Sequence, residues 1–268
     1  MPYFHSGDVK LFYEDEGQGE TLLLLHGFTC DHRMWEAQLQ FFSSNFRVLV
    51  LDSRGHGKSE APETGYSRDH RVEDTKLLLE ELKIDKVHLV GLSMGGSTAI
   101  GFALKYTERL KSMVLVSTGA AGHSPGKKIG ILDEIALTKG INAAKEKWLE
   151  WILVWFNKRD PEIGRLIRKM VNDHSGAIWI DPMRGKYPRT IDVENAHKIK
   201  ARTLIVAGQL DHLFVELSEK LHQEIKNSQL ILLENAGHML NLEYPAEFNA
   251  ELSNFLKSLG QKKETKSL

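Results

Sequence analysis

Short apolar runs alternate with amphipathic stretches along most of the chain. The runs are dominated by Leu, Val and Ile and span 21–27, 46–52, 86–91, 110–118, 202–208 and 228–234. Between them, apolar residues recur at helical spacing over 33–43, 68–83, 94–107, 213–226 and 245–259. Continuous apolar runs bounded by turn residues are typical of strands buried on both faces, as parallel strands between helices are. The alternation therefore predicts the α/β class, with a mostly parallel, doubly wound sheet.

Two segments depart from this alternation. Residues 8–13, followed by the stretch EGQG, predict an antiparallel hairpin arm at the edge of the sheet. Residues 119–198 contain no buried strand run but hold amphipathic stretches, so they predict a helical cap inserted into the fold. Because the strand and helix rhythm resumes near residue 202, we expect one core domain made of 1–118 and 199–268, interrupted by the cap.

Composition narrows the kind of partner. The 268 residues are 41% hydrophobic and 26% charged, which is typical of a globular protein. The formal net charge of −1 gives no reason to expect nucleic acid or a membrane surface as a partner, and no apolar run is long enough to span a bilayer. We expect a monomer or homodimer that acts on a small molecule.

Two features bear on the compartment. The single cysteine, Cys30, excludes an internal disulfide framework and fits a reducing environment. The N-terminal residues carry acidic groups and lack the apolar segment of a signal peptide. The expected location is cytoplasmic.

The most informative motif is Gly91-Leu92-Ser93-Met94-Gly95, at the predicted junction between a strand and a helix. Glycines two positions on either side of a serine let the chain reverse sharply and hold the serine in a strained conformation, the arrangement known as a nucleophile elbow. The alternative is a serine that merely caps the helix. We interpret Ser93 as a catalytic nucleophile.

A serine hydroxyl needs a base within reach and an acid that orients the base. Where the nucleophile is an elbow serine, the acid and then the histidine follow later in the chain. Asp211 follows the predicted strand 202–208, and His238 follows the last strand, so both are expected at the same sheet edge as Ser93. Glu234 and Asp52 are alternatives for the acid, and His212 is an alternative for the base.

Acyl transfer also needs N–H donors for the oxyanion. We assign these to the backbone N–H groups of Phe28, in the loop after the first buried strand, and Met94, just after the serine. His26 is expected to brace that loop and Cys30 to be a buried spectator. In the glycine-rich stretch 51–62, Asp52 and Arg54 are expected to tie loops together near the site; a phosphate loop is excluded because its lysine-ended pattern is missing.

With these residues identified, the chain resembles serine members of the α/β-hydrolase superfamily. The motifs that carry the resemblance are HGF at 26, DSRGHGKS at 52, GLSMGG at 91, GQLD at 208 and AGH at 236. The layout is similar to 3-oxoadipate enol-lactonases and small carboxylesterases. This resemblance implies a serine hydrolase with a catalytic triad that cleaves an ester or lactone without a cofactor or metal.

The cap is expected to select the substrate. Trp148, Trp151, Trp155 and Phe156 predict an apolar ceiling over the site, or alternatively packing of the cap against the core. Arg165, Arg168 and Lys169 predict either contact with a substrate carboxylate or a solvated helix face.

Two other functions remain open on the same motifs. One is an enzyme that hydrolyses carbon–carbon bonds or performs a non-hydrolytic elimination with the same triad. The other is a ligand receptor or signalling protein built on this fold. A complete triad is compatible with both.

Overall fold

The computed structural model describes residues 2–121, 128–156, 160–183, 186 and 191–260, without the side chains of 128, 129, 154–156 and 213. The strands are β1 (Tyr3–Ser6), β2 (Val9–Glu16), β3 (Thr21–Leu25), β4 (Arg47–Leu51), β5 (Val87–Leu92), β6 (Leu110–Val116), β7 (Thr203–Gly208) and β8 (Ser228–Leu233). The helices are α1 (Glu36–Phe42), α2 (Arg68–Glu81), α3 (Met94–Lys105), α4 (Lys128–Lys139), α5 (Ile141–Phe156), α6 (Pro161–Asp173), α7 (Ala177–Ile180), α8 (Asp192–Asn195), α9 (His212–Glu224), α10 (Leu240–Glu243) and α11 (Pro245–Gly260). The described residues also form the short 3-10 helices η1 (His32–Trp35), η2 (Thr107–Arg109) and η3 (Ala196–Lys198).

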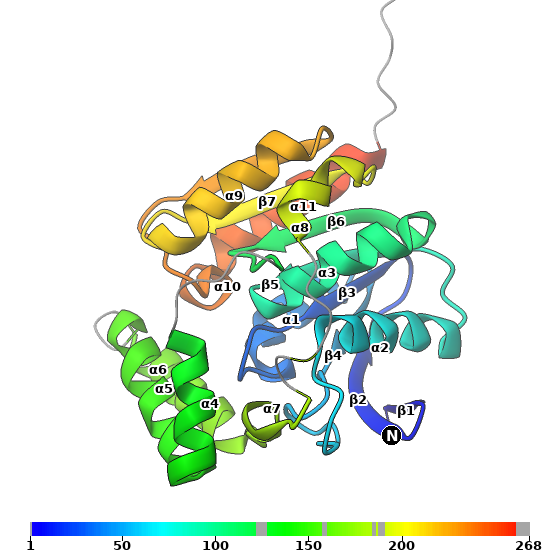
Figure 1. Ribbon diagram of the computed structural model, residues 1–268. Coiled ribbons are helices and arrows are strands. Elements are labelled where there is room, and N and C mark those ends of the chain that lie inside the picture. The colour runs from blue at the N-terminus through cyan, green and yellow to red at the C-terminus, as the bar shows by residue number, and fades with distance from the viewer. Residues whose placement is uncertain (1, 122–127, 157–159, 184–185, 187–190, 261–268) are drawn as a thin grey trace, which may run out of the picture.

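One sheet organises the described part of the chain. Its eight strands follow the order β1-β2-β4-β3-β5-β6-β7-β8, and the six strands from β3 to β8 run parallel (Figure 1). The predicted mostly parallel α/β sheet is therefore confirmed. The strands β3 and β5, in the middle of the order, are buried at every position, whereas the edge strand β8 is partly exposed. Burial on both faces explains the continuous apolar runs.

Successive strand residues point to opposite faces of the sheet, and each face has its own apolar core. Leu22 and Leu24 belong to a cluster with α1 and α11, while Leu23 and Leu25 belong to a cluster with α2, α3 and α9. The sheet is thus covered on both sides, as the doubly wound prediction requires (Figure 1). No helix in the described ranges is both long enough and apolar enough to cross a membrane.

Two local predictions need correction. The N-terminal arm is antiparallel and lies at the sheet edge, but its hairpin turn joins β1 to β2 between Ser6 and Val9, not at the EGQG stretch. The helix predicted over 33–43 begins instead as the 3-10 turn η1, and α1 follows it. The Asp31 carboxylate accepts the Arg33 N–H at 3.1 Å and so caps this tighter first turn.

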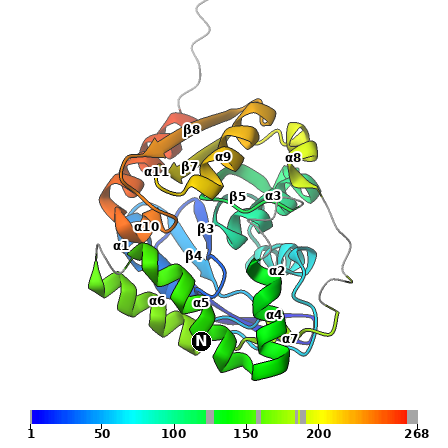
Figure 2. The ribbon, with the colours of Figure 1, turned by 60° about the vertical axis from the view of Figure 1, so that its left-hand side comes forward.

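Helices α4–α7, called the cap helices below, lie between β6 and β7 in the chain and gather on one side of the molecule (Figures 1 and 2). Polar contacts join them to loops that follow β3 and β4. The Ser175 N–H and hydroxyl both donate to the Gly55 carbonyl, at 3.2 and 2.7 Å. Arg33 pairs with Asp173 at 2.8 Å. The limits of the inserted domain, 119–198, stay a prediction.

Two buried histidines meet where the cap helices contact the core. His56 follows β4, His174 follows α6, each is 1% exposed, and their ring centroids lie 4.4 Å apart. Burial, followed by the nearby positive charge of Lys145, lowers the pKa of His174 to about 3. Burial, followed by the neighbouring His174, lowers the pKa of His56 well below its ordinary value. Both rings are therefore neutral at pH 7 in the folded protein.

This pair predicts an acid-sensitive stability. A histidine with a lowered pKa in the folded state contributes fully above the unfolded value of about 6.5, and the contribution is lost as pH falls from there toward the folded pKa. For His174 the loss between pH 7.5 and 5.0 is about 2 kcal/mol, or about 4–8 °C in Tm. We expect His174→Asn, which keeps an acceptor for Gly176, to show a smaller decrease in Tm than the wild type. His5→Asn, at an exposed position of β1, is the matched control. Equal decreases for the wild type and His174→Asn, by calorimetry, would contradict the assignment.

Candidate active site

Ser93 occupies the sharp turn between β5 and α3. Its backbone has φ 52° and ψ −107°, a region that residues with a Cβ rarely adopt. Such conformations cost on the order of 1–3 kcal/mol and persist only where the surrounding structure enforces them. Here the Ser93 N–H donates to the Val116 carbonyl, and the Ser93 carbonyl accepts from the Gly119 N–H, each at 3.0 Å. The Ser93 side chain makes no capping hydrogen bond, so the alternative of a helix-capping serine is wrong.

The turn is possible because its flanking positions lack a side chain. A Cβ on Gly91 would clash with the carbonyl of Gly95, and a Cβ on Gly95 would clash with the carbonyl of Leu25 on β3. The glycines of the motif thus allow the strand, the helix and the neighbouring strand to approach at backbone distance. The close packing of β3, β5 and α3 therefore requires the two glycines of the motif.

Asp211 and His238 are brought together from separate loops. Asp211 follows β7, is 1% exposed, and its Oδ2 lies 2.6 Å from Nδ1 of His238, which follows β8. The His238 side chain is 21% exposed, so its other ring nitrogen remains accessible. The phenyl ring of Phe214 on α9 lies against the imidazole, with centroids 4.4 Å apart. The arrangement orients an imidazole with a buried carboxylate, as a general base requires.

Glu243 fixes the loop that carries His238, and the sequence analysis missed it. Its carboxylate accepts the N–H of Gly237 at 3.0 Å and of Met239 at 3.2 Å, one on each side of the histidine. These contacts span only six and four residues, but they depend on the short helix α10, which has too few residues to show a helical pattern in the sequence. The Leu210 N–H also donates to the Ala236 carbonyl at 2.9 Å, which ties the Asp211 loop to the His238 loop.

The loop after β3 lies beside the elbow. A Cβ built on Gly27 would stand 3.7 Å from the Ser93 Cβ. The His26 Nδ1 is 2.8 Å from the Gly27 carbonyl, and its Nε2 accepts the Ser53 N–H at 2.9 Å, so His26 braces this loop as predicted. Burial lowers the pKa of His26, which keeps it neutral. Among the described residues, the N–H of Phe28 has no acceptor.

Met94, the other predicted oxyanion donor, is the first residue of α3, where an N–H has no partner within the helix. The Ser93 hydroxyl makes no hydrogen bond within the described ranges, so Ser93 and His238 are not hydrogen-bonded to each other in this structure. In enzymes without substrate, such catalytic hydrogen bonds are often long. The assignment of Ser93, Asp211 and His238 as a triad stays a prediction.

The other candidates for nucleophile, acid and base have environments that do not favour catalysis. Cys30 is buried, and burial raises the pKa of its thiol. His212 and Glu234 are exposed to solvent at the surface. Arg54, in the glycine-rich stretch, makes two hydrogen bonds to Asp74 on α2, at 2.8 and 2.6 Å, so it fixes this stretch to a helix and does not join two loops as predicted.

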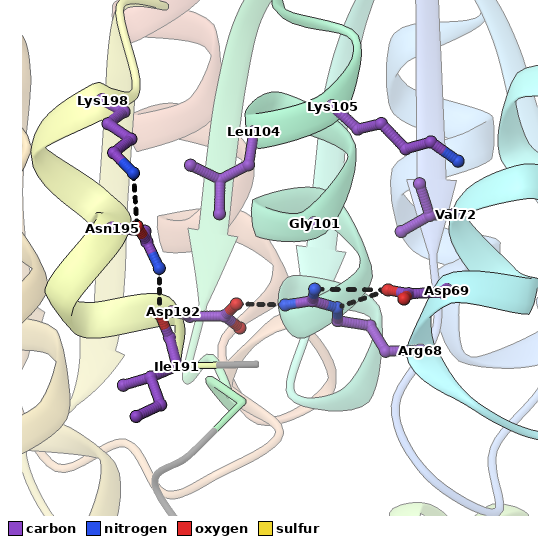
Figure 3. Close-up of a pocket in the computed structure, with 10 residues that line it drawn as sticks. All are labelled: Arg68, Asp69, Val72, Gly101, Leu104, Lys105, Ile191, Asp192, Asn195 and Lys198. Carbon is purple, nitrogen blue, oxygen red and sulfur yellow. Dashed lines mark hydrogen bonds and ion pairs between the residues drawn. The ribbon is translucent and has the colours of Figure 1, made fainter. Parts of the chain in front are cut away.

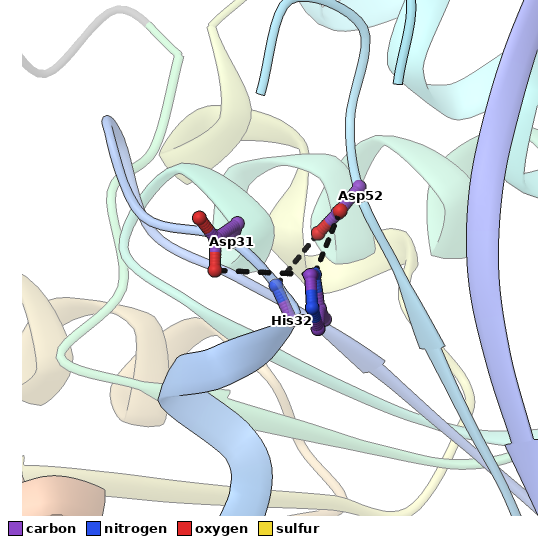
Figure 4. Close-up of side chains that lie close together, drawn as sticks. All are labelled: Asp31, His32 and Asp52. Atoms are coloured by element: carbon purple, nitrogen blue, oxygen red, sulfur yellow. Dashed lines mark hydrogen bonds and ion pairs between the residues drawn. The ribbon is translucent and has the colours of Figure 1, made fainter. Parts of the chain in front are cut away.

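Asp31, His32 and Asp52 bring ligand-type atoms within 4.8 Å of one another (Figure 4). Asp52 accepts the His32 N–H at 2.6 Å and lies 2.8 Å from its Nδ1, while Asp31 pairs with Arg33 at 2.5 Å. Because these atoms already pair with protein groups, the cluster fits a structural network better than a metal centre. It connects the loops after β3 and β4, as predicted for Asp52.

The cap residues chosen from the sequence fall into three groups. Trp148 and Trp151 are partly buried in an apolar cluster that includes Phe28 of the core, so packing of the cap against the core accounts for both. Contact with substrate stays a prediction for them. The side chains of Trp155 and Phe156 lie outside the described residues.

The third group is the basic row on α6. Arg165, Arg168 and Lys169 are exposed, and two of them form ion pairs within their own helix, Arg165 with Glu162 and Lys169 with Asp173. This arrangement favours the solvated helix face over a site for a substrate carboxylate.

A pocket of about 370 Å³ lies between α2, α3 and α8, toward the far end of α3 from Ser93 (Figure 3). Arg68 crosses it and pairs with Asp192 and Asp69. Asp192 is fully buried and also accepts the Ala121 N–H. This hydrogen bond joins the chain leaving β6 to the chain that returns toward β7, and the ion pair with Arg68 attaches both to α2. The pocket's acidic groups are thus engaged in holding the connection to the cap helices.

Comparison with known proteins agrees with the fold. The enol-lactonase from Burkholderia xenovorans LB400 is 26% identical, with a TM-score of 0.86, and the match covers 96% of this chain and 100% of that chain. A thermophilic esterase from Thermogutta terrifontis is 28% identical, with a TM-score of 0.84, covering 94% and 95%. The 2-hydroxy-6-oxo-6-phenylhexa-2,4-dienoate hydrolase of Comamonas testosteroni is 28% identical over 264 residues, 93% of this chain and 92% of that protein.

A family model decides the relationship. The model of the Alpha/beta hydrolase family matches residues 22–251, which include the parallel sheet, the elbow and the two loops that carry Asp211 and His238. The resemblance stated from the motifs is therefore confirmed at the level of the family. The chain belongs to the alpha/beta hydrolase family of enzymes.

Proposed function

We propose that the chain is a serine hydrolase that cleaves a carboxylic ester or lactone of a small, partly apolar substrate through an acyl-enzyme on Ser93. The observation that carries the proposal is the strained serine at the carboxyl edge of the sheet, the edge from which a buried Asp211 orients His238. Similarity to an enol-lactonase and an esterase supports the same class of reaction.

The proposed mechanism depends on which ring nitrogen of His238 carries the proton in the hydrogen bond with Asp211. If Nδ1 of His238 donates to the carboxylate, Nε2 carries a lone pair that can accept the proton of the Ser93 hydroxyl. The serine oxygen then attacks the carbonyl carbon, and His238 returns the proton to the departing alcohol. A water molecule then gives a proton to His238 and attacks the acyl carbonyl carbon. His238 returns this proton to the Ser93 oxygen as the acid is released. Asp211 stabilises the imidazolium that forms in each half.

The oxyanion of each tetrahedral intermediate is assigned to the N–H groups of Phe28 and Met94. The Phe28 N–H has no acceptor in the part of the chain that the structure describes, and Met94 is the first residue of α3; both observations support this role. Preorganised donors of this kind contribute strongly because they cost no reorganisation at the moment of reaction. The apolar residues Trp148 and Trp151 of the cap are proposed to limit the substrate to a partly apolar one.

Replacing the nucleophile tests the proposal. We expect Ser93→Ala to lower ester turnover by about 10³-fold or more while the fold is retained. A fluorophosphonate probe should add one mass increment, and peptide mapping should locate it at Ser93. Ser97→Ala, one turn further along α3, is the matched control and should keep both activity and labelling. Activity retained in Ser93→Ala would remove this serine from the reaction.

The strain of the elbow is testable separately from turnover. Glycine adopts φ 52° without steric penalty, so we expect Ser93→Gly to be more stable than Ser93→Ala by about 1 kcal/mol, or about 2–4 °C in Tm. At Ser97, inside α3, the order should reverse, because glycine is about 1 kcal/mol less favourable than alanine in a helix. The same sign at both positions would argue against a strained elbow.

A second candidate activity is hydrolysis of a 2-hydroxy-6-oxo-dienoate, which the similarity to the Comamonas testosteroni hydrolase favours. A p-nitrophenyl ester series and a 2-hydroxy-6-oxo-6-phenylhexa-2,4-dienoate are to be compared by kcat/KM on the same preparation. We expect the esters to be preferred, because the basic groups on α6 face solvent and pair within their helix. A preference of 10-fold or more for the dienoate would replace the ester assignment with this one.

A further inference from the structure

A hydrogen-bond relay connects the cap to the loop after β3. The Trp148 indole N–H, on α5, donates to the Thr29 hydroxyl at 2.7 Å across 119 residues of chain. The same hydroxyl donates to the Phe28 carbonyl at 2.7 Å. Thr29 is fully buried, so its hydroxyl has a donor and an acceptor supplied entirely by the protein. The relay ends on the backbone of the residue whose N–H is proposed as an oxyanion donor.

Thr29 has a backbone conformation that its side chain disfavours. Its φ is 60°, in the left-handed region, where a β-branched residue is a genuine outlier. Such a conformation is maintained only by surrounding contacts, and it concentrates at functional sites. The hydroxyl relay is a contact of this kind, because it fixes the side chain of Thr29 against the carbonyl of the preceding residue. Loss of the relay would therefore free the loop at this point.

The side chain of Phe28 is packed by the same helix. Its ring centroid lies 5.6 Å from the Trp148 ring and 6.0 Å from the Trp179 ring on α7, both in edge contact. The Trp179 indole N–H has no acceptor among the described residues. Two tryptophans of the cap thus contact Phe28, but Trp148 alone of the two also donates a hydrogen bond to Thr29.

We propose that Trp148 is a positioning residue: its indole N–H, acting through Thr29, holds the Phe28 carbonyl and so restrains the backbone dihedral angles of Phe28, which set the direction of its N–H in the oxyanion hole. Docking of the cap then completes the site as well as covering it. This inference rests on the proposed function. Because the oxyanion forms only during reaction, loss of the relay lowers kcat and leaves KM nearly unchanged. Removing a whole donor costs about 10²–10³-fold, so displacing one should cost about 10–30-fold.

Trp148→Phe tests the relay, because phenylalanine keeps a ring against Phe28 but has no N–H. We expect kcat for a p-nitrophenyl ester to decrease about 10–30-fold with KM within about twofold. Trp179→Phe is the matched control, since it makes the same chemical change at a ring that also contacts Phe28, and it should retain kcat within about twofold. A raised KM with unchanged kcat in Trp148→Phe would show that Trp148 acts only through contact with the substrate, and would overturn its role as a positioning residue.

The other end of the relay gives an independent test if Trp148→Phe folds poorly. Thr29→Val removes the hydroxyl and keeps the shape, whereas Thr29→Ser keeps the hydroxyl, so we expect Val to lower kcat and Ser to restore it. The double variant Trp148→Phe/Thr29→Val should lose no more than either single change. Additive losses, or equal kcat for Val and Ser, would overturn the relay. Failure of the proposed function is distinguished in the wild type, by absent ester turnover or absent labelling of Ser93.

Discussion

The close approach of backbone segments at the end of β5 is the constraint on which the rest of the structure depends. Within one residue the chain changes from a strand paired on both sides to a helix packed over the same sheet. Gly91 and Gly95 permit this because a Cβ on either would clash with a carbonyl. Ser93 takes the conformational cost, with hydrogen bonds to β6 and the loop after it. The strained backbone of Ser93 at the carboxyl edge is thus a consequence of packing. The chemistry proposed for its hydroxyl uses a geometry that the fold already requires.

The sheet also explains how residues far apart in sequence come to share one edge. β5, β6, β7 and β8 are parallel neighbours, so the loops that follow them leave the sheet on the same side. Direct backbone contact then couples two of these loops, because the Leu210 N–H donates to the Ala236 carbonyl. Glu243 adds a carboxylate that binds the backbone on both sides of His238. The backbone on both sides of His238 is therefore fixed, in addition to the contact of its ring with Asp211. This limits the conformational entropy that the loop loses when the imidazole acts as a base.

Sequence patterns predicted the parts of this molecule that depend on local periodicity. The six parallel strands and the helices that cover them follow from apolar runs and helical spacing, and the turn at Ser93 and the contact of Asp211 with His238 follow from motif and chain order. β1 was missed because a four-residue edge strand has too few positions to show a pattern. The contact between Trp148 and Thr29 was missed for another reason, because these residues are 119 positions apart and only the tertiary fold brings them together. Glu243 lies four and six residues from the N–H groups that it accepts, but these contacts depend on α10, which at four residues is too short to show a pattern.

Backbone strain in the described residues has a clear distribution. The non-glycine residues with positive φ are Thr29, Lys83, Ser93, Ser117 and Asn235. All except Lys83 lie within four residues after a parallel strand, at the carboxyl edge that carries the candidate site. Strain that served only to connect elements would occur equally at the amino ends of the strands, where turns are just as necessary. Its concentration at one edge indicates that loop geometry there is selected for the position of side chains and N–H groups, and that the cap, which contacts this edge through Thr29, helps to maintain it.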